Sequence, residues 1–201
     1  MPFPARLAIA SKNPHKLREL GRICGDWPVE WLTVQNHPGP WPDVAEPHDT
    51  YLDNALEKAR GIAAALGEPA IADDSGIEVD ALGGAPGPRS ARFAGEEASD
   101  AENLAKLLAE VPNDGDRRVA YVCALAYAEP GDETRVFTER CEGELAHEPR
   151  GDGGFGYDPA FVPADRDDGR TMAELGVAEK DAISHRGRAA RAFLEWLGGR
   201  S

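Results

Sequence analysis

Apolar residues recur along the chain with two periods, one typical of helices and one typical of strands. Spacings of three and four predict helices at residues 14–24, 51–66, 100–111 and 172–197, the last with a break near residue 184. Each is expected to turn one apolar face to a core. The first three starts carry recognisable caps: Asn13 before Pro14, Thr50 with Asp53, and Ser99 with Glu102.

Short apolar runs and strict alternation predict the strands. They lie at residues 6–10, 29–34, 70–72, 117–127 and 134–145, and residues 77–79 fit a continuation of the third. Residues 36–49, with four prolines, and 151–169, rich in glycine, are predicted to be loops. Strands that alternate with helices early in the chain and then form a long hairpin predict an α/β fold with a mixed sheet.

The composition is that of an ordinary globular protein. Of 201 residues, 41% are hydrophobic and 29% are charged, and the length fits one domain, with room for two lobes. The start, Met1–Pro4, lacks the basic and apolar regions of a signal peptide, and no run of about 18 apolar residues occurs. We therefore predict a cytoplasmic protein without a membrane partner.

The formal net charge of −14 argues against nucleic acid as a partner, because duplex binding depends on clustered Lys and Arg. It does not exclude a small polyanionic substrate, since a few converging cations and a divalent metal ion reverse the local potential of a cleft. Most of the acid is therefore expected on a solvated surface, and only individual carboxylates are site candidates.

The first candidate site lies where a predicted strand leads into a helix, and consists of Ser11, Lys12, Asn13, Pro14, His15 and Lys16. Unpaired backbone N–H groups at a helix N-terminus bind anions, and Lys16 adds a positive charge one turn into the helix. This arrangement predicts a cradle for a triphosphate, although a capped helix with surface lysines fits the same residues. It is not a P-loop, because the G-x-x-x-x-G-K-[ST] spacing is absent.

The second candidate is the pair Asp73-Asp74, followed by Ser75 and Gly76, at the end of a predicted buried strand. Adjacent strand residues point to opposite faces, so one carboxylate can face a cleft while the other supports the loop. Mg²⁺ prefers such oxygen ligands and keeps waters that a second carboxylate can deprotonate. An Asx turn with an exposed acid pair is also compatible with these residues.

The third candidate is the glycine-rich segment from Gly151 to Pro159. It matches G-x-G-x-x-G, but it lies late in the chain and Tyr157-Asp158-Pro159 blocks a helix start, so a dinucleotide site is rejected. Aromatic side chains on such a loop suit stacking on a base, and Asp158 can accept from a ring N–H or an amine. A glycine loop anchored by two core aromatics, Phe155 and Tyr157, is the alternative.

The fourth candidate is Ser184-His185-Arg186. Ser184 is predicted to cap a helix, with His185 and Arg186 pointing outward from its first turn. Arg186 can then pair with an oxyanion or a base carbonyl, and a basic first turn on a solvated helix is the alternative.

Several other chemistries are excluded by missing patterns. The remaining histidines form no H-x-x-x-H or H-E-x-x-H arrangement, which argues against a zinc hydrolase. A serine hydrolase would need a G-x-S-x-G elbow. The three cysteines form no C-x-x-C pair, so neither a zinc ribbon nor a disulfide framework is predicted.

Taken together and in this order, the four candidates resemble the inosine triphosphate pyrophosphatase family, whose members remove noncanonical purine nucleotides. The resemblance extends from residue 11 to residue 187. The matching stretches are residues 11–16 with Glu19, residues 53–55 with Lys58 and Ala59, and residues 72–76, 82–87, 90–92, 153–159 and 184–187.

This resemblance implies a mixed, twisted central sheet flanked by helices, two lobes around a substrate cleft, and a homodimer. It also implies hydrolysis of ITP, dITP and XTP to the monophosphate and pyrophosphate, with Mg²⁺ as cofactor. By position, Asp74 matches the catalytic acid and, with Glu46, the Mg²⁺ site. The substrate-binding matches are residues 11–16, Ser75, Phe155, Gly156, Tyr157, Asp158, Lys180, His185 and Arg186.

The implied chemistry suits these residues. Lys16 and Mg²⁺ would neutralise the triphosphate while Asp74 activates water, and donors from His185 and Arg186 would meet a 6-keto base. An adenine amine would leave those donors unpaired. Two alternatives remain: a sensor that binds purine triphosphates without cleaving them, and a related pyrophosphatase acting on modified pyrimidine nucleotides.

Overall fold

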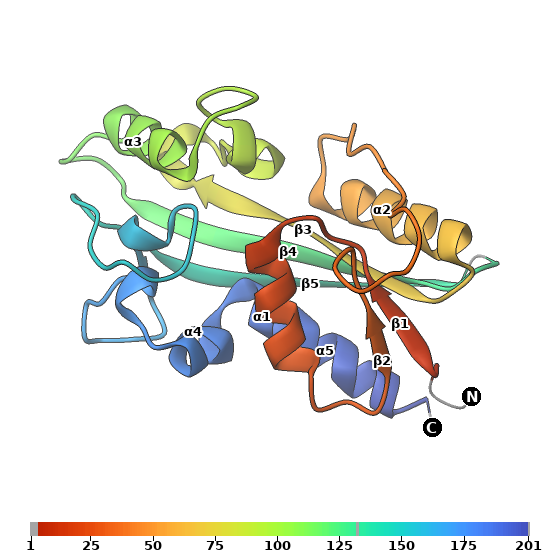
Figure 1. Cartoon of the computed structure of the whole chain (residues 1–201). Coiled ribbons are helices and arrows are strands. Elements are labelled where there is room, and N and C mark those ends of the chain that lie inside the picture. Colours follow the sequence, from red (N-terminus) through yellow and green to blue (C-terminus); the bar gives the residue numbers. More distant parts are fainter. Residues whose placement is uncertain (1–3, 132, 201) are drawn as a thin grey trace. The chain divides into compact units, whose positions relative to one another are not determined.

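The computed structural model describes residues 4–131 and 133–200 (Figure 1). These residues divide into two compact units. The first unit contains the described residues up to 74, 123–139 and those from 186 onward, and the second contains 75–122 and 140–185. Most of the Met1–Pro4 segment, for which no signal peptide was predicted, lies outside the described residues.

One six-stranded sheet has the order β2-β1-β3-β4-β5-β6. Strand β1 pairs in parallel with β2 and β3, whereas β5 and β6 are antiparallel. The predicted α/β fold with a mixed sheet is therefore confirmed. The strands are β1 (Arg6–Ile9), β2 (Glu30–Leu32), β3 (Ala70–Val79), β4 (Arg118–Ala128), β5 (Thr134–Leu145) and β6 (Phe161–Pro163).

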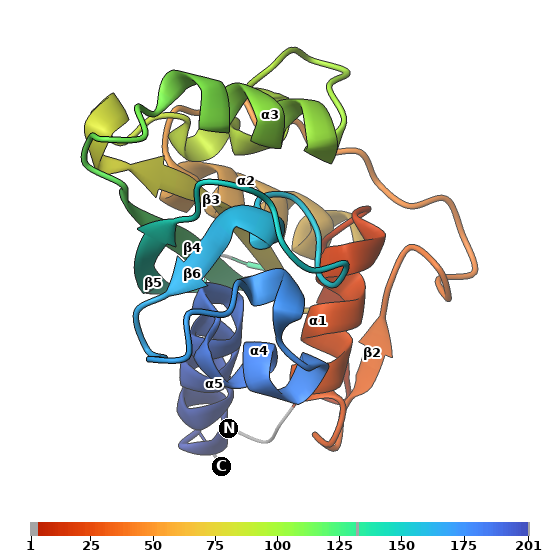
Figure 2. The same cartoon turned by 90° about the vertical axis from the view of Figure 1, so that its left-hand side faces the viewer.

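In the first unit, helices cover both faces of the strands (Figure 2). Strands β3 and β4 present alanines, among them Ala72 and Ala124, to α2, and larger residues, among them Ile71 and Leu125, to α1 and α5. This alternation follows from the period of two in a strand, and it allows α2 to pack closely. The helices are α1 (Pro14–Cys24), α2 (Tyr51–Leu66) and α5 (His185–Gly198).

The second unit has its own core, in which Tyr121 of β4 and Phe161 of β6 stack with ring centroids 4.4 Å apart. Helix α3 (Asp100–Glu110) packs Leu104 and Leu107 onto this core, and α4 (Val177–Ile183) precedes α5. The predicted capping box at the start of α3 and the predicted helix break near residue 184 are both confirmed. None of the described helices is long and apolar enough to cross a membrane.

Two predicted boundaries are wrong. Strand β3 runs without a break through Asp73, Asp74, Ser75 and Gly76, so the pair lies inside a strand and forms no Asx turn. Residues 151–169 are not one loop, because they contain a 3₁₀ turn at Asp158–Ala160 and strand β6. Strand β6 was not predicted because its few apolar residues lie among glycines and prolines, which favour loops.

Candidate active site

The two carboxylates of β3 face opposite sides of the strand, as the period of two requires. Asp73 shares the side of Ile71 and contacts residues of α1 and α5, whereas Asp74 shares the side of Ala72 and contacts α2. Both are buried, with 1% and 6% of their surface exposed. One strand thus places two acids in two environments.

Asp73 is surrounded by cations. Its Oδ2 lies 3.1 Å from Lys16 Nζ and accepts a hydrogen bond from Arg186 Nε at 3.0 Å. Arg186 also donates to Glu19 Oε2 at 2.6 Å. Burial alone would raise the pKa of Asp73, but the charges of Lys16 and Arg186 outweigh burial and hold it far below its usual range. Asp73 therefore stays ionised and organises the cations.

Asp74 has a different environment. Its Oδ2 accepts a hydrogen bond from Asn54 Nδ2 at 3.0 Å. Burial raises the pKa of Asp74 above its ordinary value, against the charges of Lys16 and Lys58 and the bond from Asn54, and the charge of Glu46 raises it further. A carboxylate that is costly to keep ionised is a good proton acceptor, which suits a general base.

Glu46 and Lys58 complete this side of the strand. Lys58 of α2 donates to Glu46 Oε1 at 2.6 Å, and its side chain is 12% exposed, whereas that of Glu46 is 39% exposed. Two carboxylates, Glu46 and Asp74, and one mostly buried ammonium group therefore lie within electrostatic reach of one another. The one ammonium group offsets part of the negative charge of the two carboxylates.

The carboxylates of Glu46 and Asp74 fit a Mg²⁺ ion that is also held by substrate. Their mutual repulsion, which contributes to the raised pKa of Asp74, would be relieved by a divalent cation. Within residues 4–131 and 133–200, no group of three His, Cys, Asp or Glu side chains is placed to hold a metal ion. Mg²⁺ needs no such group, because it commonly binds through one or two carboxylates, waters and substrate phosphates.

The predicted phosphate cradle begins helix α1. Asn13 caps this helix, its Oδ1 accepting hydrogen bonds from the N–H groups of His15 at 2.8 Å and Lys16 at 3.4 Å. Those N–H groups already have a partner, so the capped helix is present. Lys12 forms an exposed pair with Asp43, whereas the side chain of Lys16 is only 15% exposed. Lys16 is therefore the better placed of the two for a substrate phosphate.

The glycine-rich segment surrounds a buried carboxylate in the second unit. Asp158 is 2% exposed and accepts from Tyr121 Oη at 3.1 Å, Lys180 Nζ at 2.6 Å and the Phe155 N–H at 2.8 Å. Gly154 has φ +70°, and a Cβ there would lie 2.0 Å from Asp158 Oδ2. The expectation that Asp158 accepts from a base is therefore not favoured, since three donors from the chain already occupy it.

The two aromatic residues of this segment have different roles. Tyr157 is 5% exposed and its hydroxyl donates to the Ser90 carbonyl at 2.7 Å, so it anchors the loop to the core. Phe155 is half-buried, and Lys180 Nζ lies 5.0 Å from its ring centroid. Gly156 holds the segment through its N–H, which donates to Asp100 Oδ2 at 2.7 Å. Phe155 remains the aromatic surface that a base can reach.

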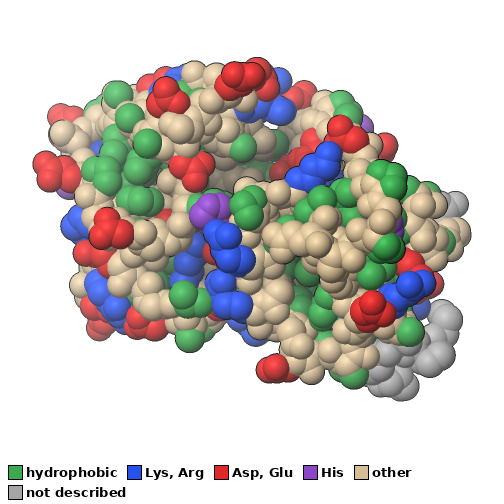
Figure 3. Space-filling model, in the orientation of Figure 1, with side chains coloured by type: hydrophobic (Ala, Val, Ile, Leu, Met, Phe, Trp, Pro, Cys, Tyr) green, Lys and Arg blue, Asp and Glu red, His purple; other side chains and the backbone are tan. Residues whose placement is uncertain are grey.

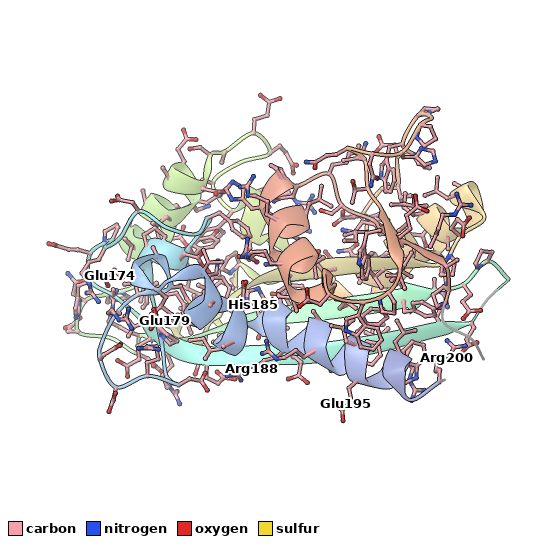
Figure 4. The ribbon with its side chains drawn as sticks, turned by 60° about the horizontal axis from the view of Figure 1, so that its bottom comes forward. Glu174, Glu179, His185, Arg188, Glu195 and Arg200 are labelled. Carbon is pink, nitrogen blue, oxygen red and sulfur yellow. The ribbon has the colours of Figure 1, made fainter. Side chains whose placement is uncertain are left out.

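His185 and Arg186 begin α5, where Figure 4 labels His185. The prediction that both point outward is wrong, since they are 6% and 2% exposed. His185 stacks on Tyr121, with ring centroids 4.6 Å apart and planes at 16°. Arg186 turns to the carboxylates of the first unit because two buried acids there need a counter-charge.

The sequence analysis included Asn54 and Lys58 among the stretches that match the family but gave them no role, and it missed Tyr121. Asn54 and Lys58 lie four residues apart on α2, a spacing that places both on one helix face, but nothing in the sequence linked that face to Asp74. Ser75 lies half-buried in β3 directly after the pair. On the face in Figure 3, acidic and basic side chains are interspersed, so surface charge alone does not mark the site.

The chain is similar to known proteins over nearly all of its length. The model of the Ham1 family matches residues 7–196. A dITP/XTP pyrophosphatase of Syntrophobacter fumaroxidans is 47% identical, covering 98% of this chain and 87% of that protein, and one of Geobacillus kaustophilus is 48% identical, covering 91% and 89%. The solved structure of the Staphylococcus aureus Ham1 protein has a TM-score of 0.85 and 39% identity, covering 98% of this chain and all of that one (100%).

Proposed function

The chain belongs to the Ham1 family, and we propose that it hydrolyses noncanonical purine nucleoside triphosphates, dITP and XTP among them, to the monophosphate and pyrophosphate. This membership agrees with the resemblance in the sequence. The observation that carries the proposal is the difference between the two adjacent carboxylates of β3. Asp73 is neutralised by Lys16 and Arg186. Asp74 has a raised pKa and lies within electrostatic reach of Lys58 and Glu46. The names of the relatives support the same reaction.

In this proposal Asp74 is the general base. Its carboxylate takes a proton from the water that attacks the triphosphate, the α–β phosphoanhydride bond breaks, and pyrophosphate leaves. Asn54 fixes the carboxylate through the 3.0 Å bond to Oδ2. Mg²⁺, held by Glu46 and Asp74, would supply positive charge to the phosphates and lower the pKa of a coordinated water.

Phosphate binding is assigned to the cations near β3. Lys16 and Lys58 both lower the pKa of Asp74 through their charge, so both are close enough to act on a polyanion there. Ser11, the N–H of Lys12 and Ser75 are proposed as further contacts to phosphate and sugar, since the N–H groups of Asn13 and His15 already donate to side chains and Pro14 has none. Each lysine now pairs with a carboxylate, and part of that pairing would be exchanged for phosphate oxygens.

Base recognition is assigned to the second unit. Phe155 supplies a stacking surface, and His185, ordered by its stack on Tyr121, donates toward a 6-keto oxygen. Lys180 and Asp158 hold the Phe155 loop. Arg186 is assigned to charge balance around Asp73, because both of its described ion pairs are with acids of the first unit.

We further propose that residues 1–201 act as one pyrophosphatase domain, and that the enzyme is a cytoplasmic homodimer. These proposals rest on the family and on the reaction, which acts on the free nucleotide pool. No nucleic-acid partner is proposed, because the net charge of −14 opposes one.

The proposed function is tested with a nucleotide panel. The protein is incubated with Mg²⁺ and dITP, XTP, dATP, dGTP or a modified pyrimidine triphosphate, and pyrophosphate and orthophosphate are assayed separately. Pyrophosphate from dITP and XTP, at much higher kcat/KM than from dATP, supports the proposal. Binding of dITP without product would indicate a sensor, and preferential cleavage of the pyrimidine would indicate the related pyrophosphatase.

A further inference from the structure

Glu46 lies in a segment without regular structure between β2 and α2. A long loop does not by itself hold a side chain in place, because its backbone lacks the repeated hydrogen bonds of a helix or strand. The side chain of Glu46 is 39% exposed, so packing around it is limited. Apart from the bond that its carboxylate accepts from Lys58, its position beside Asp74 therefore depends on contacts made by its neighbours in the loop.

The first contact is a clamp formed by Asn54 of α2. Its Oδ1 accepts from the His48 N–H at 2.9 Å, and its Nδ2 donates to the His48 carbonyl at 3.0 Å. The same Nδ2 donates to Asp74 Oδ2 at 3.0 Å. Asn54 is 2% exposed, its bond to Asp74 is buried, and its two bonds to the exposed His48 are partly buried. One side chain thus joins the loop of Glu46 to the carboxylate of Asp74.

The second contact lies two turns further along α2, at Gly61. An ideal Cβ at Gly61 would lie 2.7 Å from Val44 Cγ2 and 3.1 Å from Val44 Cγ1. Glycine inside a helix costs about 0.5–1 kcal/mol relative to alanine, and this one has no positive φ that would require it. The absence of a side chain at Gly61 is explained by the close approach of Val44, two residues before Glu46.

We propose that Asn54 and Gly61 are positioning residues that hold the loop of Glu46 against α2, and so keep its carboxylate beside Asp74 for metal binding. The proposal deepens the proposed function and rests on it for the role of Glu46. Val44 is β-branched and has few side-chain rotamers, so a methyl group at residue 61 would displace the loop rather than the Val44 side chain alone.

Gly61→Ala is the most direct test, because alanine is a better helix former than glycine and the variant is expected to fold. We expect its melting temperature to be equal to or above that of the wild type. The concentration of Mn²⁺ that half-saturates the protein in calorimetry should rise about 10-fold, the scale seen when support of a metal ligand is lost. Hydrogen exchange of the amides in residues 42–49 should become faster.

Two further variants make this result specific. Gly21→Ala places the same change in the interior of α1, where nothing lies within 4 Å of the added Cβ, and should leave metal binding and exchange unchanged. Val44→Ala combined with Gly61→Ala removes the methyl groups that collide, and should restore both quantities toward the wild type.

The proposal is overturned if Gly61→Ala matches Gly21→Ala in metal binding and exchange, or if Val44→Ala fails to rescue it. Calorimetry with Mn²⁺ and hydrogen exchange need no turnover. If wild-type protein released no pyrophosphate from dITP, the proposed function would therefore fail while these two measurements still decided the role of Gly61.

Discussion

Asp73 and Asp74 are neighbours in sequence but differ in their surroundings, because a strand turns successive side chains to opposite faces. Lys16 and Arg186 keep Asp73 ionised, whereas burial makes ionisation of Asp74 costly. Asp73 is therefore expected to contribute to stability, and Asp74 to reactivity.

Asp73→Asn should destabilise the fold by about 3 kcal/mol at pH 7, because it removes the buried carboxylate that Lys16 and Arg186 share. Arg186 then keeps its pair with Glu19 alone among its described ion pairs. Asp43→Asn is the matched control. It removes a pair with Lys12 whose two side chains are exposed, so its contribution to stability is expected to be much smaller. Urea unfolding of both variants at pH 7 measures the difference, and equal effects would contradict the assigned role of Asp73.

The stability conferred by Asp73 should also depend on pH with a definite sign. Its folded-state pKa is lowered, so its contribution is fully present above the unfolded-state pKa of about 3.9 and is lost as pH falls below that value. The gap in unfolding free energy between wild type and Asp73→Asn should therefore shrink between about pH 4 and pH 2. A constant gap over that range would argue against the charge assignment.

Asp74 should set the acidic limb of the pH–rate profile, since only its ionised form accepts a proton. Its raised pKa places that limb above the usual range of an aspartate. Lys58→Gln should move the limb to higher pH, because the lysine charge lowers the pKa of Asp74, and Glu46→Gln should move it to lower pH. Profiles of kcat/KM at fixed Mg²⁺ measure both shifts, and shifts in one common direction would contradict the geometry.

At the scale of elements, the sequence predicted the helices well because their signals are local. Asn13, Thr50 and Ser99 cap the expected helices by the expected hydrogen bonds. Strand β6 and the middle of β3 were missed, because Phe161 and Asp74 lie among glycine, proline and acidic residues that favour turns. Both segments form strands because they pair with strands that are distant in the sequence. A short stretch of sequence does not contain that information.

Prediction of the candidate site from the sequence was limited in the same way, because contacts between distant residues define it. The sequence and the resemblance assigned roles to Asp74 and Glu46. The structure assigns roles to Asn54 and Lys58, which the resemblance matched without a role, because these roles depend on α2 lying beside β3. The outward orientation of Arg186 was predicted from a helix start alone. Its burial could not be foreseen, because the two acids that bind it are 113 and 167 residues away.

The loop at 153–158 provides a prediction at this scale. Gly154→Ala should lower the melting temperature and raise KM for dITP, because its φ of +70° strains alanine and the Cβ would meet Asp158 Oδ2. Gly169→Ala, with φ +68° and open space, carries the strain without the collision. Thermal melts and initial rates compare them, and equal KM values in the two variants would count against a role for Asp158 in holding Phe155.

At the scale of the whole molecule, each unit is built on its own buried core, and β3, β4 and β5 run from one unit into the other. The acids Glu46, Asp73 and Asp74 belong to the first unit. Phe155 and His185, which are assigned to base recognition, belong to the second. Composition and periodicity predicted the class of the fold. They carried no information on how its residues divide between two cores, because β3 to β5 each contribute to both.

The proposed homodimer is a prediction at this scale. Light scattering after gel filtration should give twice the mass of one chain over a tenfold range of concentration. A mass of one chain throughout that range would refute the dimer without affecting the proposed chemistry, since the residues assigned to the reaction all lie in one chain.

The proposed role of Asp74 as the base in pyrophosphate release is tested by comparing single-turnover cleavage of dITP by the wild type and Asp74→Asn. We expect a rate loss of about 10²- to 10⁴-fold, the usual contribution of a general base. We also expect an unchanged or higher melting temperature at pH 7, because burial disfavours ionised Asp74 and the amide oxygen of the replacement side chain can still accept from Asn54. Pyrophosphate release near the wild-type rate by a folded variant would contradict that role.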